Sequence, residues 1–388
     1  MRIWILFCCL AGLTACIREE EYVNDPEGNF DQLWKIIDEK YCFLDYKDID
    51  WDAIGTEYRS RLYPEMSNQE LFGVLNDMLY ELKDGHVNLT SEENQSHFDF
   101  WTDSPVNFNE SLIENTHYLG RNYRQIAGLK YRILSDNIGY IYYETFADGI
   151  GNSDLDVVFS YLADCKALIF DVRQNSGGNA TNSTQIASRF TNEKILTGYI
   201  QHKTGPGHHD FSRPYAIYLE PSKNIRWEKK VAVLTNRHSY SATNDFVKHM
   251  KCLPNVVIVG DKTGGGSGMP FSSELPNGWT VRFSASPHFD RDMNQIEWGI
   301  NPDVKIIGLL LPKYYVVEET EKAVNQIWKP YFESIISSFQ QKYANFSFYD
   351  FKNLSEISQN QNYYQDLSHL NRIGACRMTE IISELVSE

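Results

Sequence analysis

The sequence predicts an α/β protein with helices ahead of the sheet and a further α/β extension after it. Residues 29–90 carry apolar side chains at a helical period, and residues 127–312 alternate strand patterns with helix patterns. Residues 313–388 again mix the two patterns. Strands that alternate with helices form a largely parallel sheet covered by helices. We therefore expect two domains, or one large domain with additions.

Amino-acid composition limits which folds and binding partners the chain can have. The 388-residue chain is 42% hydrophobic and 14% aromatic, which supplies enough apolar surface for a sizeable core. Its formal net charge is −16. Binding to nucleic acid needs clustered lysine and arginine against phosphate, and the sequence holds no such cluster. Composition therefore argues against nucleic acid as a partner.

The first residues are typical of a targeting segment. Arg2 precedes an apolar stretch, residues 3–13, that is too short to remain in a bilayer as a helix. Leu-Thr-Ala-Cys at 13–16 resembles the lipobox of bacterial lipoproteins. The resemblance implies a signal peptide at 1–15, a lipid on Cys16, a tether at 16–28 and a lipid anchor in the outer membrane of the cell envelope, on its periplasmic or surface face. An ordinary secretory signal with a chance cysteine is the alternative.

Residues 29–90 predict three helices. Their apolar faces are formed by Phe30, Leu33, Trp34, Ile37 and Tyr41, by Ile54, Tyr58 and Leu62, and by Leu71, Leu75, Met78, Leu79 and Leu82. Asp50 is placed to cap the second helix, and Ser67 with Glu70 forms a capping box for the third. The third helix is expected to end at Asp84-Gly85, because glycine readily takes the left-handed conformation that ends helices.

His86 follows directly, ahead of a short strand pattern that includes Val87 and Leu89. A histidine at such a junction is held by its backbone while its side chain projects, and it titrates near neutral pH, which suits a general base. An ordinary surface or interface histidine would give the same pattern. Residues 91–126 are polar and aromatic without a clear period, and we expect a loop or flap there.

A glycine-rich loop is the second candidate site. Strands are expected at 138–143 and 167–172, with helices opening at Ser153 and covering 181–190. Between the second strand and its helix lies Asp171-x-Arg173-x-Asn175-x-Gly177-Gly178. Paired glycines let the backbone approach a ligand and turn N–H groups toward it. Ligands in such sheets bind at the carboxyl ends of strands, where this loop lies, although a simple tight turn would read the same way.

Ser241 is the third candidate. It stands between an apolar strand pattern at 231–234 and a helix pattern that includes Phe246, Val247 and Met250. The first N–H groups of a helix have no partner within it, and the helix dipole favours negative charge there. That place suits a serine nucleophile whose attack creates an oxyanion. The alternative is that Ser241 merely caps the helix.

The three motifs together resemble the tail-specific, or C-terminal processing, serine peptidases. They are Leu82-Lys-Asp84-Gly-His86, the loop at 171–178, and Ser241-Ala-Thr243 with Val259-Gly-Asp-Lys-Thr263-x-Gly265 downstream. Each is weak alone, but their order and separations make the set specific, and the resemblance covers roughly residues 30–308. It implies a crotonase-like (ClpP/crotonase-type) core, a polypeptide substrate and no cofactor.

The chain departs from the better known form of that family. Members with a Ser–Lys dyad have their lysine at the position of Gly266, and Lys262 does not replace it. The chain instead looks similar to the tricorn-like branch, in which a histidine of the first motif is the base. His86 matches that histidine. The resemblance implies that Ser241 attacks a peptide carbonyl while His86 takes its proton.

The resemblance also implies the remaining site residues. The backbone N–H groups of Ala242 and of Gly177 or Gly178 would form the oxyanion hole. The branch places a glutamate before a Gly-Ile/Val-x-Pro-Asp stretch, which residues 299–303 match. Glu297 is the nearest acid, although it stands one residue closer to the glycine than expected. A plain surface carboxylate is the alternative for Glu297.

Cysteine and histidine usage predicts no metal site. Four cysteines remain outside the signal and the lipobox, at positions 42, 165, 252 and 376. They are widely separated, so we expect small buried side chains, with one disulfide still open. His208-His209 has no acidic or cysteine partner at metal-ligand spacing in the sequence.

Residues 313–388 predict a helix at 331–339, a strand at 346–351 and a closing helix at 372–385. The block from Tyr364 through Asp366 to His369 is similar to the last block of SGNH-type esterases, but no Gly-Asp-Ser block accompanies it.

The leading prediction is a serine endopeptidase that acts on extended or unfolded polypeptides. A catalytically inactive relative that binds a peptide or small ligand is the main alternative, and an esterase centred on His369 is a distant one.

Overall fold

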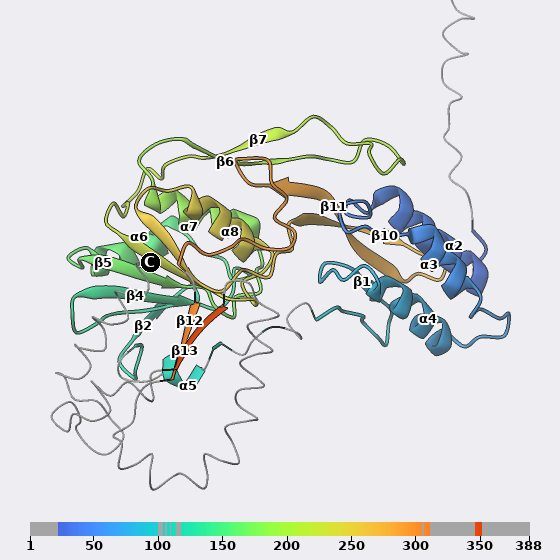
Figure 1. The fold of residues 1–388 in the computed structure, drawn as a ribbon, viewed down its shortest axis with the longest axis horizontal. Coiled ribbons are helices and arrows are strands. Elements are labelled where there is room, and N and C mark those ends of the chain that lie inside the picture. Colours follow the sequence, from blue (N-terminus) through green and yellow to red (C-terminus); the bar gives the residue numbers. More distant parts are fainter. Residues whose placement is uncertain are drawn as a thin grey trace, which may run out of the picture. The chain divides into compact units, whose positions relative to one another are not determined.

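The computed structural model describes residues 22–99, 104, 107–108, 110–113, 118–304, 306–310 and 346–350 (Figure 1). These residues form two compact units. Unit 1 takes its residues from Met1–Thr102, Gly198–Ile217 and Gly266–Glu297, and unit 2 from Asp103–Thr197, Tyr218–Gly265 and Trp298–Glu388. Two stretches of the predicted core region 127–312 therefore belong to the same unit as the N-terminal helices.

Unit 1 contains the three predicted helices. They are α2 (Pro26–Lys40), α3 (Trp51–Arg59) and α4 (Asn68–Tyr80). Asp25, Asp50 and Ser67 cap them in turn, each accepting a hydrogen bond from a first-turn N–H. Glu70 accepts from the Ser67 N–H in return, which completes the capping box. The predicted helices, the Asp50 cap and the capping box are confirmed.

The predicted end of the third helix is wrong. Helix α4 ends at Tyr80, ahead of Asp84-Gly85, and Lys83 rather than glycine takes the left-handed φ of 47°. The chain tightens past Tyr80, where the N–H groups of Leu82 and Lys83 donate three residues back along the chain. The carbonyl oxygens of Leu82 and Lys83 accept hydrogen bonds from Lys47 Nζ, at 3.2 and 3.4 Å. A charged donor from a distant segment thus satisfies carbonyl groups just beyond the end of the helix.

An antiparallel sheet accompanies these helices. Its strands are β1 (Asn88–Thr90), β10 (Gly268–Glu274) and β11 (Thr280–Phe289), and it continues into β6 (Ile195–Ile200) and β7 (Tyr215–Leu219) in the order β1-β11-β6-β7, with β10 paired to β11. Glu274 pairs with Thr280, and Gly278 has a φ of 83° in the turn between them. The hairpin turn predicted at residues 275–279 is confirmed.

The core of unit 1 lies between the helices and β11. Phe30, Leu33, Leu75, Met78 and Val281 are fully buried there. Burying one such side chain stabilises the fold by about 1.5–3 kcal/mol, so the apolar faces of α2 and α4 fix these helices against the sheet. The segment from Leu82 to β1, which carries His86, is held at both ends by this core.

Unit 2 is built on a six-stranded sheet in the order β2-β3-β4-β5-β8-β9. The strands are β2 (Arg124–Ile126), β3 (Leu129–Ile133), β4 (Ile138–Tyr143), β5 (Ala167–Asp171), β8 (Val231–Thr235) and β9 (Val256–Gly260). The last four are mutually parallel, as predicted, whereas β2 and β3 pair in antiparallel fashion. Because β5 and β8 are parallel neighbours, the loops that leave their carboxyl ends meet at one edge of the sheet.

Helices cover this sheet. They are α6 (Asn152–Leu162), α7 (Ala180–Ala187) with the 3₁₀ turn η1 (Ser188–Phe190), and α8 (Ala242–Lys251). Figure 1 shows α7 beside α8, and the two helices are in contact. Phe170 of β5 and Phe246 of α8 are fully buried with ring centroids 5.2 Å apart. This contact fixes α8, and hence its N-terminus, on the sheet.

The remaining described segments are short. Among the described residues of 91–126, predicted as a loop or flap, the helical turn α5 (Glu110–Ile113) and strand β2 occur beside turns and irregular backbone. Strand β12 (Ile306–Leu310) pairs in parallel with β13 (Phe346–Asp350), which confirms the strand predicted there. The signal, the first part of the tether (16–21) with Cys16, Cys376, the predicted helices at 331–339 and 372–385 and the block ending at His369 lie outside the described residues.

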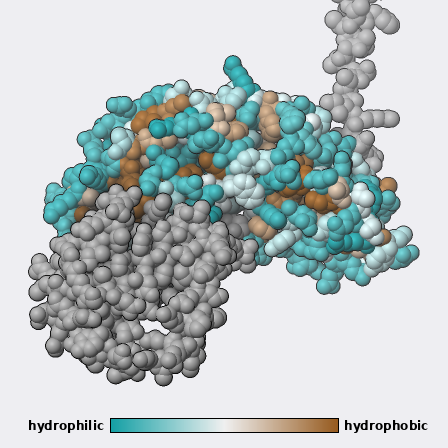
Figure 2. Space-filling view, viewed as in Figure 1, coloured by the Kyte–Doolittle hydropathy of each residue, from teal (hydrophilic) through white to brown (hydrophobic). Residues whose placement is uncertain are grey.

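The described part of the face shown in Figure 2 is mainly hydrophilic. Figure 2 shows polar side chains over most of the described atoms in that view, with apolar ones in smaller groups. None of the helices in the described ranges has both the length and the apolar character needed to cross a bilayer. Within the same ranges, Cys42, Cys165 and Cys252 form no disulfide, and no cluster of His, Cys, Asp and Glu has the arrangement of a metal site.

Candidate active site

Ser241 lies where β8 delivers the chain to α8, as the sequence predicts. It occupies the N-cap position with φ 57° and ψ −121°, a backbone conformation that non-glycine residues rarely adopt and that costs about 1–3 kcal/mol. Its side chain makes no capping hydrogen bond to the helix. The alternative that Ser241 merely caps the helix is therefore wrong, and the strained turn needs another explanation.

Backbone hydrogen bonds hold the chain on both sides of Ser241. The N–H of Ser241 donates to Gly265 O at 2.8 Å, and the N–H of Asp245 donates to Ser241 O at 3.0 Å. The N–H of Tyr240 donates to Asn175 O at 3.1 Å. Because two neighbouring loops and helix α8 supply these bonds, the surrounding structure imposes the unfavourable dihedral angles on Ser241.

Asn175 connects the glycine-rich loop to the serine helix. Its side chain is fully buried, and its Oδ1 accepts hydrogen bonds from Gly177 N at 3.0 Å and Thr243 Oγ1 at 2.6 Å. Its Nδ2 donates to Tyr143 O at 3.0 Å. A buried amide with these partners is well satisfied and rigid, so it fixes the loop relative to α8.

Gly177 stands directly against the nucleophile candidate. A Cβ placed on it would lie 2.8 Å from Ser241 Cβ and 3.0 Å from Ala242 N. The φ angles of Gly177 and Gly178 are 102° and 137°, which side chains disfavour, and a Cβ on Gly178 would lie 2.2 Å from Ala147 N. Glycine is thus required twice, by close approach and by backbone conformation.

Two backbone donors near the serine point to an anion site. Gly177 N–H is already bound to Asn175, whereas within the described part of the chain no acceptor is seen for the N–H groups of Gly178 and Ala242. Ala242 is also the first residue of α8, where the helix dipole favours negative charge. Such a pair of donors can stabilise an oxyanion that forms on a carbonyl attacked by Ser241.

Unit 1 holds His86, which is buried with 4% exposure. It lies at the predicted junction, between α4 and β1, and its N–H donates to Asp84 Oδ1 at 2.8 Å. Burial, with Arg282 and Lys47 adding to it, lowers the pKa of His86 to about 4, although Asp84 and the Gly268 backbone oppose the shift. At neutral pH the imidazole is therefore uncharged, the form that can accept a proton.

Asp84 is the carboxylate of this segment. It is 2% exposed and accepts hydrogen bonds from Tyr41 OH at 2.9 Å and Ser284 Oγ at 3.0 Å. Burial raises its pKa, but Lys47, His86 and the hydrogen bonds outweigh burial and hold the pKa below its ordinary value. Asp84 therefore stays ionised and fixes the backbone of His86 through its second oxygen.

Glu297 belongs to the same buried cluster. It is 4% exposed, so the alternative of a plain surface carboxylate is wrong. Its Oε1 lies 3.0 Å from Lys47 Nζ, and its Oε2 accepts from Ser267 N at 2.8 Å. Burial raises the pKa of Glu297 to about 7 and Asp84 adds to the shift, while Lys47 counteracts it. Gly266, at the dyad-lysine position, donates its N–H to Glu297 O.

Lys47 is the residue that sequence reasoning missed. Its Nζ lies between Glu297 and Asp84, 3.6 Å from Asp84 Oδ2, and its side chain is 2% exposed. Burial lowers the pKa of Lys47, but the two carboxylates outweigh burial and raise the pKa above its ordinary value. The one available signal was a lysine within the aromatic and apolar run at residues 41–49.

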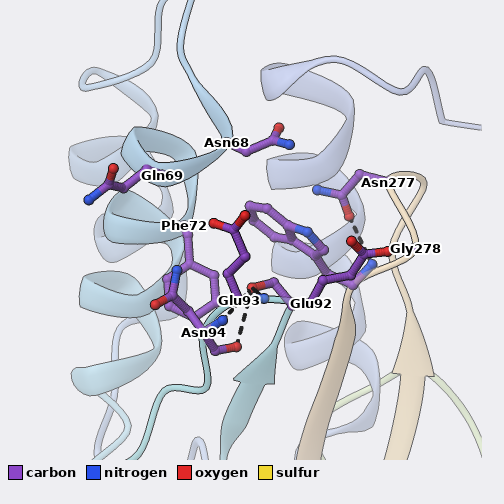
Figure 3. Close-up of a pocket in the computed structure, with 10 residues that line it drawn as sticks. Asn68, Gln69, Phe72, Glu92, Glu93, Asn94, Asn277 and Gly278 are labelled. Atoms are coloured by element: carbon purple, nitrogen blue, oxygen red, sulfur yellow. Dashed lines mark hydrogen bonds between the residues drawn. The ribbon is translucent and has the colours of Figure 1, made fainter.

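A separate pocket of about 400 Å³ lies in unit 1. Figure 3 shows Phe72 and Glu93 on one side of it and Asn277 on the other. Phe72 packs edge-on against Trp279, with ring centroids 5.5 Å apart. The full lining is Asn68, Gln69, Phe72, Ser91, Glu92, Glu93, Asn94, Asn277, Gly278 and Trp279. None of the predicted site residues belongs to this lining.

His208 and His209 have acidic neighbours that sequence spacing did not indicate. His208 Nε2 lies 2.8 Å from Asp38 Oδ1, and His209 Nδ1 lies 3.2 Å from Asp45 Oδ2. Both carboxylates come from the N-terminal segment of unit 1. The first contact is a hydrogen bond at a partly exposed surface, which ties the 202–212 loop to that segment, and the second lies on an exposed side chain.

Two family models match the chain. The model of peptidase family S41 matches residues 137–306, and the model of the tricorn protease C1 domain matches residues 22–80. The first range contains Gly177, Gly178, Ser241 and Glu297, while the second contains Lys47 and ends just before Asp84 and His86.

Solved structures give the same answer for the fold. A candidate peptidase from Parabacteroides merdae ATCC 43184 is 51% identical with a TM-score of 0.70, over 73% of this chain and 90% of that one. A photosystem II D1 C-terminal processing protease is 13% identical with a TM-score of 0.51, over 73% and 94%. Mature CPAF is 12% identical with a TM-score of 0.55, over 72% and 92%. The last two show a shared fold.

Proposed function

Because this chain belongs to peptidase family S41 and is a serine-type peptidase, we propose that Ser241 is its nucleophile and His86 its general base in the cleavage of extended or unfolded polypeptides. Ser241 Oγ attacks the carbonyl carbon of a peptide bond as His86 removes the hydroxyl proton. His86 then returns that proton to the leaving amine, which leaves an acyl-enzyme for water to hydrolyse.

The observation that carries the assignment is the strained turn at Ser241. A residue with φ 57° at the start of a helix, with no capping role for its side chain, persists only because the structure around it enforces that position. Such a turn presents a hydroxyl group at the carboxyl edge of the sheet, beside backbone donors. No other serine among the described residues has a positive φ.

The proposed oxyanion hole consists of the N–H groups of Ala242 and Gly178. The sequence left Gly177 and Gly178 as equal alternatives, and the bond from Gly177 N to Asn175 Oδ1 favours Gly178. Each such donor typically contributes about 3 kcal/mol to stabilisation of the transition state. Gly177 supports the site by allowing the loop to approach Ser241.

Glu297 is proposed as the third polar group. Its burial in one cluster with Asp84 and Lys47 supports this role, since Asp84 also binds the backbone of His86. In the proposed reaction a proton taken up by His86 makes an imidazolium, whose positive charge Asp84 favours and Lys47 opposes.

The substrate class is tested with unfolded and folded proteins side by side. The purified chain should cleave reduced, unfolded casein at internal bonds and leave a compact folded control protein intact, with fragments identified by mass spectrometry. Ser241→Ala should abolish the cleavage, and Ser160→Ala, a change of an exposed serine on α6, should not. Equal cleavage by the Ser241→Ala chain would contradict the assignment.

The location is a second part of the proposal. The Leu-Thr-Ala-Cys run at 13–16 supports a lipid on Cys16 and anchoring in the outer membrane of the cell envelope. Cells fed an alkyne-bearing fatty acid should label the wild-type chain, and Cys16→Ser should remain unlabelled and leave the membrane fraction. Labelling that survives Cys16→Ser would contradict the anchor.

A further inference from the structure

We propose that Lys47 is a positioning residue for the reaction: its ammonium group holds Asp84 and Glu297 as a pair of carboxylates and fixes the segment that presents His86. The inference rests on the proposed function, because it assigns the lysine to the base of that reaction. The contacts of Lys47 that carry the inference lie within unit 1.

The geometry places four oxygen atoms around one ammonium group. Lys47 Nζ lies 3.0 Å from Glu297 Oε1 and 3.6 Å from Asp84 Oδ2. It also donates to Leu82 O at 3.2 Å and to Lys83 O at 3.4 Å. These two carbonyl groups directly precede Asp84 and His86 in the chain. One side chain therefore anchors both the acids and the backbone that leads to the base.

Charge balance explains why a lysine is needed there. The side chains of Asp84 and Glu297 are 0% and 3% exposed, and two carboxylates cannot both stay ionised in such a place without a cation. Removal of the ammonium group would leave two buried acids, of which one takes up a proton. The groups that face this cluster are Tyr41, Cys42, Tyr46, Asp84, His86, Arg282 and Glu297.

Lys47 differs in kind from a dyad lysine. A lysine that acts as a base must lose its proton near neutral pH, which requires a lowered pKa. The carboxylates instead raise the pKa of Lys47, so it stays a cation through the reaction. It supplies charge and position, and His86 supplies the site that accepts the proton.

The test measures how fast a fluorophosphonate probe labels Ser241 in the full-length chain, over about pH 5–9. If activity requires both carboxylates to be ionised, Lys47→Met should shift the acidic limb of the labelling-rate profile to higher pH by about one unit or more. At pH values below the shifted limb, labelling should be about tenfold slower than in the wild type. Lys47→Arg keeps the positive charge, so the acidic limb of this variant's profile should stay at the wild-type pH, although its labelling rate falls. Lys40→Met, an exposed lysine of the same unit, is the matched control.

A double-mutant cycle separates this role from a structural one. In a Glu297→Gln background, Lys47→Met should slow labelling far less than it does in the wild type, because the second carboxylate is gone. Independent, multiplicative effects in the cycle, or an acidic limb that Lys47→Met leaves unmoved, would overturn the inference. If Lys47→Met does not fold, Lys47→Arg decides, and a displaced limb in that variant overturns it.

Failure of the proposed function gives a different result. A wild-type chain that the probe never labels at Ser241 at any pH removes the nucleophile assignment, and the role of Lys47 with it. A wild-type chain that labels while the lysine variants match it at every pH removes the role of Lys47 alone. Thermal unfolding of each variant shows that the compared chains are folded.

Discussion

The two units hold their candidate site residues by different physical means. Unit 2 presents Ser241 through backbone geometry, with a strained turn, close glycines and a neutral buried amide at Asn175. Unit 1 surrounds His86 with charge, since Lys47, Asp84 and Glu297 are buried together. A nucleophile needs a fixed position, which backbone hydrogen bonds and close packing provide. A base needs a defined protonation state, which burial and nearby charges determine.

The difference predicts which substitutions impair each part of the proposed site. The serine half is Ser241 with the backbone around it, and the histidine half is His86 with its buried charged neighbours. The serine half should respond to changes in shape and backbone freedom and be nearly indifferent to pH. The histidine half should respond to pH and to changes in charge while tolerating modest changes in shape. The following variants test that contrast, from the largest expected effect to the smallest.

Ser241→Ala should reduce peptide hydrolysis at least about 10⁴-fold, because the reaction loses the proposed nucleophile while the fold is kept. Initial rates on unfolded casein measure the loss, and circular dichroism checks the fold. The exposed-serine variant Ser160→Ala should match the wild type. Residual activity within tenfold of the wild type would show that the nucleophile is another residue.

Gly177→Ala should slow hydrolysis by about 10²–10³-fold, because its Cβ would lie 2.8 Å from Ser241 Cβ and would displace the adjoining Gly178 donor. The matched control is Gly73→Ala in α4, where a Cβ meets no atom within 4 Å. That control should keep full activity and gain about 0.5–1 kcal/mol of stability. Equal activity of both variants would contradict the close approach of the loop to the serine.

His86→Asn should change how stability depends on pH. Burial lowers the pKa of His86 to about 4 from an ordinary 6.5, so the unfolded chain binds a proton before the folded one does as pH falls. The His86 contribution is complete above pH 6.5 and is lost, by about 3 kcal/mol, as pH falls to 4. Urea unfolding across this window should therefore show a smaller acid loss in His86→Asn, and parallel wild-type and variant curves would contradict burial as the cause.

Ser241→Gly should be more stable than Ser241→Ala by about 1 kcal/mol, because glycine adopts φ 57° without strain and this gain exceeds its larger entropy in the unfolded chain. Both variants lack the hydroxyl group, so the comparison isolates the backbone. Denaturant midpoints of the two inactive chains measure the difference. Equal midpoints would mean that the turn at Ser241 stores no strain.

Local patterns carried much of the prediction. The three N-terminal helices, their caps, the hairpin turn at 275–279 and the parallel strands follow from periodicity and turn chemistry within single stretches of chain. The position of Ser241 between a strand and a helix was predicted for the same reason, since strand, turn and helix adjoin in sequence. The glycine pair was equally visible, because close approach and positive φ demand that residue type.

The charged half was only partly predictable. Lys47, Asp84 and Glu297 come from three distant segments, and no spacing rule links them, so their contact arises from the tertiary fold alone. The hydrogen bonds from Lys47 to Leu82 O and Lys83 O, just past the end of α4, were missed for the same reason. The burial of Glu297 was equally invisible in sequence, where it reads as one acid among many.

The measurement that tests the central claim most directly is labelling of the purified chain with a fluorophosphonate probe, followed by peptide mapping of the adduct. His86→Ala is treated in parallel, with His97→Ala, an exposed histidine of unit 1, as the matched control. We expect an adduct on Ser241 in the wild type and the control, and its loss in His86→Ala. An adduct on another serine, or equal labelling of Ser241 without His86, would contradict it.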